Sequence, residues 1–319
     1  MLILSIGVSP ESHLAKSCGL EVGTRGHICV DSNMRTADPD LYAVGDAVLV
    51  PDWFTKEKKN FALAGPANRQ GRIAADHICG IDSFYDGAQG SAIIKIFDLT
   101  VATTGLTERA AKANGFDCEA VHLYSPSHAT YYPGAAMISG KIVFDRNSGR
   151  LLGGQFIGTQ GVDKRCDVLA TAIRANMSGV DLPRLELCYA PPYSSAKDPL
   201  NMAGFVIENQ LTGKVSIAHW KDVANLDRTE CGLLDVRTDA EYTEGHIPGA
   251  LHIPLDNLRG RLAELDQDKT YYVFCLGGLR SYVATRILVG NGYKCFNLSG
   301  GWHWYDSMRT SGAITNLNW

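Results

Sequence analysis

The sequence of 319 residues lacks the patterns that mark several large classes of protein. No apolar run approaches the roughly 18 residues of a membrane helix. Its first residues show neither the basic segment nor the cleavage site of a signal peptide. It has no excess of basic residues either, since 30 Lys and Arg stand against 34 Asp and Glu. We therefore expect a cytoplasmic protein that binds neither membranes nor nucleic acid.

Two short motifs are also missing. No G-x-G-x-x-G occurs, so the sequence contains no loop of the type that holds a dinucleotide pyrophosphate. The nine cysteines include no C-x-x-C pair, which argues against a disulfide framework and a structural zinc site, and we expect no metal. The 33 glycines favour an α/β protein rich in turns and ligand loops.

Changes of pattern along the chain divide it into three segments. In the first, the apolar residues 1–8 and the segment 41–47 predict strands, and residues 64–80 predict a helix. Strands around an Asn-Ser-Gly turn and two helices predict an α+β domain next, and strands alternating with helices after a polar stretch predict an α/β domain. The predicted domains are 1–90, 91–210 and 211–319.

The third domain contains a loop suited to a reactive cysteine. Cys275 follows a buried strand and precedes a helix, and this is where α/β folds place their ligands. The glycines of the loop let successive backbone N–H groups point inward, and Arg280 and the helix N-terminus add positive potential. Such a cradle would hold a thiolate, a persulfide or a thiosulfonate, although a lone cysteine can also be a buried structural residue. The loop residues are Leu276, Gly277, Gly278 and Leu279.

Residues 213–319 closely resemble a rhodanese domain. The D-V-R strand end, the segment EGHIPGALHIP and the C-x-x-G-x-R loop follow one another in the family's order. The resemblance implies that Cys275 is the nucleophile and Arg280 the anion-binding group. It also implies that Asp235 and Arg237 support the loop, and an ion pair without a direct role is an equal alternative. Leu276 departs from the basic residue of many members, and His246 is interpreted as structural.

The first segment resembles the second flavin-binding motif of the pyridine nucleotide-disulfide reductases. The motif is TADPDLYAVGD, and the match continues through LAGPANRQGRIAAD. The family's aspartate binds the flavin ribityl chain, and its helix directs a positive end at the flavin pyrimidine edge. Asp46 could instead simply cap a helix. The flavin-binding residues implied by the resemblance are Gly45, Asp46, Ala64 and Gly65.

The middle segment resembles the dimerisation domain of the same family. Two of its stretches, HATYYPGA and YAPPYSSAKDPLNMAGF, are similar to those of coenzyme A-disulfide reductases and rhodanese-fused persulfide reductases. In these enzymes tyrosines reach the partner subunit's active site, where they bind a thiol substrate or stabilise a thiolate. Tyr131 and Tyr189 are the favoured candidates and Tyr132 and Tyr193 their rivals, and each could instead be a core or interface residue.

Together the resemblances predict a partial FAD-binding domain, an α+β dimerisation domain and an α/β rhodanese domain. They imply the C-terminal part of an FAD- and NAD(P)H-dependent reductase of coenzyme A disulfide, persulfide or polysulfide, in which Cys275 carries sulfane sulfur. The expected partners are a second copy bound through residues 91–210, thiols or persulfides such as coenzyme A, and missing N-terminal FAD and NAD domains. Alternatives are a stand-alone sulfurtransferase on a dimer scaffold and an inactive truncated fragment. We expect the chain alone to bind FAD weakly or not at all.

Overall fold

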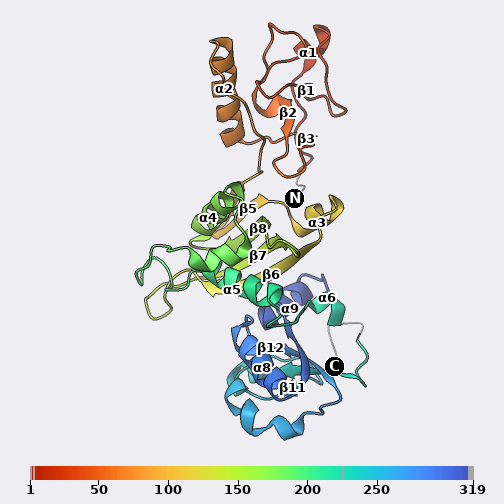
Figure 1. Cartoon of the computed structure of the whole chain (residues 1–319), viewed down its shortest axis with the longest axis vertical. Helices are drawn as coiled ribbons and strands as arrows, with labels where there is room; N and C mark the ends of the chain where they lie inside the picture. Colours follow the sequence, from red (N-terminus) through yellow and green to blue (C-terminus); the bar gives the residue numbers. More distant parts are fainter. Residues whose placement is uncertain (1, 3, 224–225, 315–319) are drawn as a thin grey trace. The chain divides into compact units, whose positions relative to one another are not determined.

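A computed structural model describes residues 2, 4–223 and 226–314 of the chain. The chain forms two compact units, Met1–Ala92 and Ile93–Trp319. Among the described residues, no helix combines the length and the apolar character needed to cross a bilayer. Figure 1 shows the elements of both units along the chain.

The first unit is a small sheet accompanied by one long helix, α2. Apolar side chains from the sheet and its loops, among them Met34, Val48 and Val50, pack with Ile73 of α2. Helix α2 begins after Leu63, and Gly80 follows its end with φ +75°. The sheet has the order β1-β2-β3, with β1 parallel and β3 antiparallel to β2. The elements are α1 (His13–Ser17), β1 (Ile28–Cys29), η1 (Gly45–Ala47), β2 (Val48–Pro51), β3 (Lys58–Lys59) and α2 (Ala64–Ile78).

The predicted helix is present in this unit, whereas the two predicted strands are wrong. Residues 4–10 pair with no strand of the described chain and are largely exposed, and residues 1 and 3 lie outside the described residues. The segment 41–47 makes one bridge, between Tyr42 and Arg35, and then turns through η1. Gly45 causes the turn, because its φ of +85° lies in the left-handed region and cannot continue a strand.

The second unit contains the predicted α+β domain. Its antiparallel sheet has the order β4-β5-β8-β7-β6, and α4 packs on β5 and β8 while α5 packs on β6. Helix α5 runs to Leu211, so the polar stretch 209–214, where the sequence predicts the linker to the next domain, includes the last three residues of the helix. The elements are β4 (Ala92–Ile96), β5 (Leu99–Gly105), α3 (Glu108–Ala113), β6 (Cys118–Pro126), β7 (Met137–Asp145), β8 (Leu151–Gly158), α4 (Val162–Arg174), η2 (Gly179–Arg184) and α5 (Pro199–Leu211).

The rest of the second unit is the α/β domain predicted from the sequence. Its parallel sheet has the order β11-β10-β12-β13-β9. Two apolar clusters form its core, one containing Leu288 of α8 and the other containing Trp220 of α6 and Tyr305 of α9. The elements are β9 (Ile217–Ala218), α6 (Trp220–Val223), β10 (Cys231–Asp235), α7 (Asp239–Glu244), β11 (Leu251–His252), η3 (Leu255–Gly260), η4 (Leu262–Glu264), β12 (Thr270–Phe274), α8 (Leu279–Gly290), β13 (Lys294–Leu298) and α9 (Gly301–Thr310).

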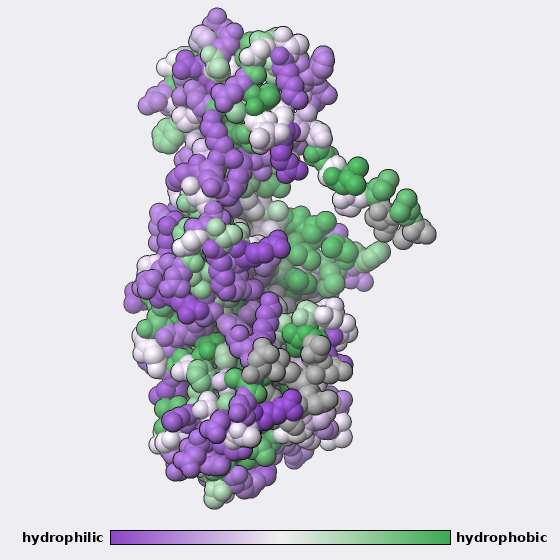
Figure 2. All heavy atoms as spheres, turned by 90° about the vertical axis from the view of Figure 1, so that its right-hand side faces the viewer, coloured by the Kyte–Doolittle hydropathy of each residue, from purple (hydrophilic) through white to green (hydrophobic). Residues whose placement is uncertain are grey.

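Both units expose large apolar side chains. In the first unit they include Leu14, Ile78 and Phe84. In the second they gather on the edge strand β4 and the turn after it, where Phe97 is 93% exposed. Green apolar surface of this kind is visible in Figure 2. The exposed apolar residues here are Ile93, Ile94 and Ile96 of β4, Phe97 of the turn and Leu99 at the start of β5.

Candidate functional site: a cysteine loop, a tyrosine pair and a flavin-type helix

The structure holds the thiol of Cys275 inside the predicted loop between β12 and α8. Cys275 is 2% exposed, and the backbone N–H of Gly278 donates to its Sγ at 3.1 Å. The hydroxyl of Ser281 lies 3.5 Å from the same sulfur. Gly278 has a φ of +122°, which favours glycine at this position of the cradle. Backbone and hydroxyl donors therefore converge on the sulfur, as a thiolate or persulfide requires.

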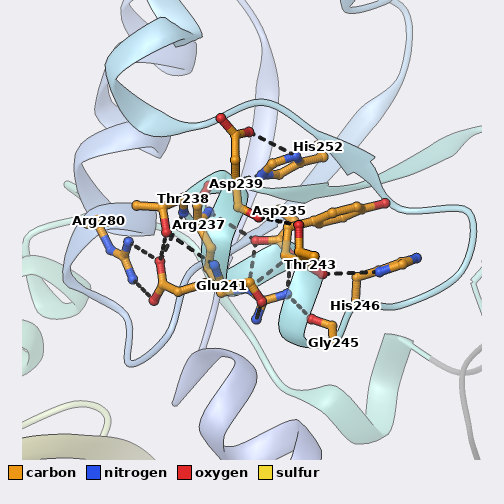
Figure 3. Close-up of polar contacts among 11 residues, drawn as sticks. Asp235, Arg237, Thr238, Asp239, Glu241, Thr243, Gly245, His246, His252 and Arg280 are labelled. Atoms are coloured by element: carbon orange, nitrogen blue, oxygen red, sulfur yellow. Dashed lines mark hydrogen bonds and ion pairs between the residues drawn. The ribbon is translucent and has the colours of Figure 1, made fainter.

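Arg280 lies beside this thiol but is held by a carboxylate. Its two terminal nitrogens donate to Glu241 Oε2 and Oε1, each at 2.6 Å (Figure 3). This bidentate contact lowers the pKa of Glu241 to about 2 and raises the pKa of Arg280. Arg280, the predicted anion-binding group, is thus already paired with a carboxylate. Glu241 was not among the predicted site residues.

Asp235 and Arg237 form a buried ion pair at the end of β10. They are 0% and 2% exposed, and Arg237 Nη2 donates to Asp235 Oδ2 at 2.6 Å. The same guanidinium donates to the carbonyls of Glu241 and Gly245 at 3.1 and 2.8 Å and lies 4.2 Å from the ring centre of Trp302. The pair therefore fixes the segment that carries Glu241, and its supporting role in chemistry remains a prediction.

His246 lies on the outside of this segment. Its ring stacks on Tyr242 with 4.2 Å between ring centres, and its Nδ1 is 3.2 Å from the Tyr242 carbonyl. The ring of His252 stacks on Tyr242 at 4.0 Å, and its Nε2 lies 3.0 Å from the Arg237 carbonyl. These contacts are those of a residue that shapes the turn.

A cavity of about 670 Å³ opens beside the loop. Leu276 lines it, together with the Arg237 and Glu241 side chains and the aromatic rings of α9. This space is large enough for a small thiol or persulfide. The full lining is Arg237, Glu241, Glu244, Gly245, His246, Pro248, Leu276, Trp302, Tyr305, Asp306 and Arg309.

The cysteine loop also contacts the sheet of the α+β domain. The backbone N–H of His303 donates to the Leu276 carbonyl at 3.0 Å, and the His303 ring stacks on Tyr124 with 3.7 Å between centres. His303 Nε2 lies 2.8 Å from Ser139 Oγ on β7. A side chain at Gly277 would meet Tyr124 at 3.3 Å, so glycine permits this close approach. The α+β domain therefore helps to hold the loop.

A second histidine, His122 on β6, bridges the same two domains. Its Nδ1 lies 2.8 Å from Ser299 Oγ, and its ring lies 4.4 Å from that of Trp304. Burial, followed by the positive charges of Lys141 and His219, lowers the pKa of His122 to about 3. An unfolded histidine has a pKa of about 6.5. The stabilisation by neutral His122 is therefore complete above pH 6.5 and declines as the pH falls toward 3.

We predict that His122 makes the protein less stable in mild acid. Between pH 6.5 and 4 the free energy of unfolding should fall by at most about 1.4 kcal/mol per pH unit from this residue. His122→Asn keeps a polar partner for Ser299 without the titration, so its unfolding curves in urea should depend less on pH. Equal pH dependence in the wild type and the variant would contradict this assignment.

The structure brings together the two favoured tyrosines of the α+β domain. The hydroxyls of Tyr131 and Tyr189 lie 2.8 Å apart, and the two side chains are 75% and 47% exposed. The bond to Tyr189 raises the pKa of Tyr131. Tyr132 and Tyr193 are exposed nearby in sequence. An exposed pair of phenols is available to a ligand or a second copy, and its role remains a prediction.

A buried ion pair, not selected from the sequence, holds the two tyrosine segments together. Arg165 of α4 donates to Asp198 Oδ2 at 2.7 Å, to the Ser127 carbonyl at 2.8 Å and to Ser194 Oγ at 3.2 Å. Ser194 Oγ also donates to Asp198 at 2.9 Å. Ser127 precedes one tyrosine segment and Ser194 lies in the other, so Arg165 is a positioning residue for both.

In the first unit, the two predicted flavin segments are neighbours. The Gly45 backbone N–H donates to Gln70 Oε1 of α2 at 2.7 Å, and the exposed Asp46 follows it in η1. Ala64 and Gly65 form the exposed first turn of α2, which has no capping side chain and no acidic residue. An exposed carboxylate beside free helix N–H groups suits ribityl hydroxyls and an electron-rich ring edge. The chemistry of these residues fits the part of FAD that the family resemblance assigns to them.

Within the described ranges, no three His, Cys, Asp or Glu residues gather in a way that could hold a metal ion.

Comparison with known proteins matches three family models to successive parts of the chain. Residues 1–71 match the family model of the pyridine nucleotide-disulphide oxidoreductases, residues 91–199 match the dimerisation domain of that family, and residues 221–308 match the rhodanese-like domain. The chain thus combines two oxidoreductase-type domains with a rhodanese-like domain. It belongs to the pyridine nucleotide-disulphide oxidoreductases that contain a rhodanese-like domain.

Named relatives and solved structures narrow the resemblance. Coenzyme A disulfide reductase from Staphylococcus epidermidis is 34% identical over 206 residues, which are 64% of this chain and 47% of that protein. The structure of reduced Bacillus anthracis CoADR-RHD has 48% identity and a TM-score of 0.93 over 98% of this chain and 56% of that one. A NAD-dependent persulfide reductase from A. fulgidus has 39% identity and a TM-score of 0.85 over 92% and 53%. The chain therefore spans about half the length of the relatives it matches.

The residues missed by sequence reasoning are those whose partners are distant in the chain. Thr238 and Glu241 form a legible capping box, but nothing in that pattern points to Arg280, which lies 39 positions away. No local motif surrounds Arg165 or His122.

Proposed function

We propose that this chain carries sulfane sulfur as a persulfide on Cys275 and serves the reduction of coenzyme A disulfide, persulfide or polysulfide. The observation that carries the proposal is the Cys275 cradle, in which the Gly278 N–H and the Ser281 hydroxyl approach the buried sulfur. The names of the relatives support the reductive half, since they include coenzyme A disulfide reductases and a persulfide reductase.

The proposed transfer begins with attack of the Cys275 thiolate on the outer sulfur of a donor. The sulfur–sulfur bond of the donor breaks, a thiolate or sulfite leaves, and a new sulfur–sulfur bond forms on Cys275. Backbone N–H groups hold the negative charge of the persulfide. A thiol such as coenzyme A then takes the outer sulfur and regenerates the Cys275 thiolate.

Mass spectrometry tests the proposal directly. After incubation with a persulfide or thiosulfate, the chain should gain the mass of one sulfur atom on the peptide that contains Cys275. Addition of cyanide should remove that mass and release thiocyanate. A chain that gains no sulfur from either donor would overturn the proposal.

The flavin part of the proposal concerns Gly45, Asp46 and the first turn of α2. When bound, FAD would supply the electrons taken from NAD(P)H. Asp46 would accept hydrogen bonds from the ribityl hydroxyls, and the N-terminus of α2 would face the pyrimidine edge. A homodimer formed through residues 91–210 would carry the pair Tyr131–Tyr189 to the partner subunit's thiol site. The matching dimerisation domain supports this assembly.

We predict that the purified chain alone binds FAD weakly and substoichiometrically, because its sequence contains no pyrophosphate-binding glycine loop. Titration of FAD fluorescence with the chain measures the affinity, and Asp46→Asn should weaken any binding further. If the chain is purified yellow with one flavin per chain, this expectation is wrong.

A stand-alone sulfurtransferase is the second candidate, favoured because the contacts of the Cys275 cradle come from the rhodanese domain itself. Sulfur transfer to cyanide by a flavin-free preparation would support it. Loss of transfer on removal of flavin would contradict it.

A further inference from the structure

Two arginines line the cavity, Arg237 and Arg309, and a third, Arg280, lies on the cysteine loop beside it; all three are paired with carboxylates. Arg280 binds Glu241, Arg309 binds Asp306 and Arg237 binds Asp235, each at 2.6 Å. Glu244 adds a further negative charge to the cavity lining, and the residue directly after the nucleophile is the apolar Leu276. Each arginine among the described lining residues therefore already has a counterion. None of them is left unpaired to bind a doubly charged oxyanion.

Glu241 occupies the central place in this arrangement. It holds the guanidinium that lies nearest the thiol, in a bidentate geometry that a competing sulfonate would have to replace. The Arg280 contact lowers the pKa of Glu241 to about 2, so its carboxylate stays charged at neutral pH. A thiosulfate dianion entering the cradle would meet both this charge and an already occupied arginine.

We propose that Glu241 is a specificity-determining residue that disfavours oxyanion donors such as thiosulfate and leaves the site to organic hydropersulfides. The inference rests on the proposed persulfide chemistry of Cys275. Discrimination by an unfavourable charge is a common route to specificity, because the rejected ligand must break the existing pair. An organic hydropersulfide does not have to break this pair, since its leaving group is a thiolate and carries no sulfonate to be bound.

The two sulfur donors release different leaving groups. With a hydropersulfide RSSH, the Cys275 thiolate takes the outer SH sulfur, the donor sulfur–sulfur bond breaks and RS⁻ departs. With thiosulfate, the thiolate takes the outer sulfur and sulfite departs as a dianion. Neither transfer needs an external oxidant or reductant, and cyanide removes the outer sulfur from Cys275 as thiocyanate in both cases. The same product therefore reports both reactions.

The test compares kcat/KM for thiosulfate and for the hydropersulfide of mercaptoethanol in the full chain and in Glu241→Gln. Glutamine retains the capping box with Thr238, so helix α7 should remain folded. The ratio of thiosulfate to hydropersulfide activity should rise about tenfold when the charge is removed and Arg280 is released. Adding Arg280→Gln to that variant should abolish the gain.

Glu264→Gln is the matched control, because it removes the same charge from another bidentate pair of this domain, Arg261–Glu264, which does not line the cavity. Its ratio of thiosulfate to hydropersulfide activity should equal that of the wild type. If Glu241→Gln uses both donors and has the same ratio of thiosulfate to hydropersulfide activity as the wild type, the assignment of Glu241 is overturned. The proposed function would then remain intact. Failure of both donors to load wild-type Cys275 would overturn the proposed function and the inference together.

Discussion

Cys275→Ser should abolish the formation of thiocyanate from thiosulfate or hydropersulfide and cyanide, by at least about a thousandfold. In the proposed transfer the thiolate is the nucleophile and the carrier of the outer sulfur, and a serine hydroxyl neither ionises at neutral pH nor stores sulfane sulfur. The site is otherwise preserved, because serine occupies nearly the same volume beside Gly278 and Ser281. The measurement is the initial rate of thiocyanate release with each donor.

Cys295→Ser is the matched control for this variant. Cys295 is also buried in the rhodanese domain, on the neighbouring strand β13, and burial raises the pKa of its thiol to about 11. Its thiol faces the Thr285 carbonyl, and it should be unreactive. We expect sulfur transfer within about twofold of the wild type for Cys295→Ser. Activity that survives in Cys275→Ser would place the sulfur on another cysteine.

Asp198→Asn should cost about 3–5 kcal/mol of unfolding free energy in the second unit. Asp198 and Arg165 are 2% and 1% exposed, so the substitution leaves a buried guanidinium without its counterion. Asp198 caps helix α5 by accepting a hydrogen bond from the Leu200 N–H, and asparagine can do the same. The loss of unfolding free energy therefore reports the removal of the charge alone. The segments that carry Tyr131 and Tyr189 should exchange their amide hydrogens faster in the variant.

The control is again Glu264→Gln, which breaks an exposed ion pair and should cost less than about 1 kcal/mol. Urea unfolding gives the free energies. Because a chain of several domains need not unfold in a single transition, hydrogen exchange at residues 127–135 and 189–199 supplies the local measurement. Equal effects of the buried and the exposed substitution would show that Arg165 does not clamp the tyrosine segments.

Continuous motifs could be interpreted from the sequence because neighbours along the chain form them. The Cys275 loop, the helix at Ala64–Ile78 and the hairpin of β7 and β8 depend on local glycines, periodicity and turn residues, and the structure contains them all. The predicted strand at 41–47 was wrong because a run of apolar residues indicates burial and not geometry, and the left-handed Gly45 turns the chain instead.

The order of the domain types and the position of the cysteine loop could be predicted from the sequence, because contiguous motifs carry both. The pairs of charges and rings that meet could be read only from the folded chain: Arg280 with Glu241, Tyr131 with Tyr189, Arg165 with Asp198, and His122 with Ser299. These partners lie 33 to 177 positions apart. Their contacts depend on how strands and helices pack. No local pattern of residues shows which of two such distant segments will meet.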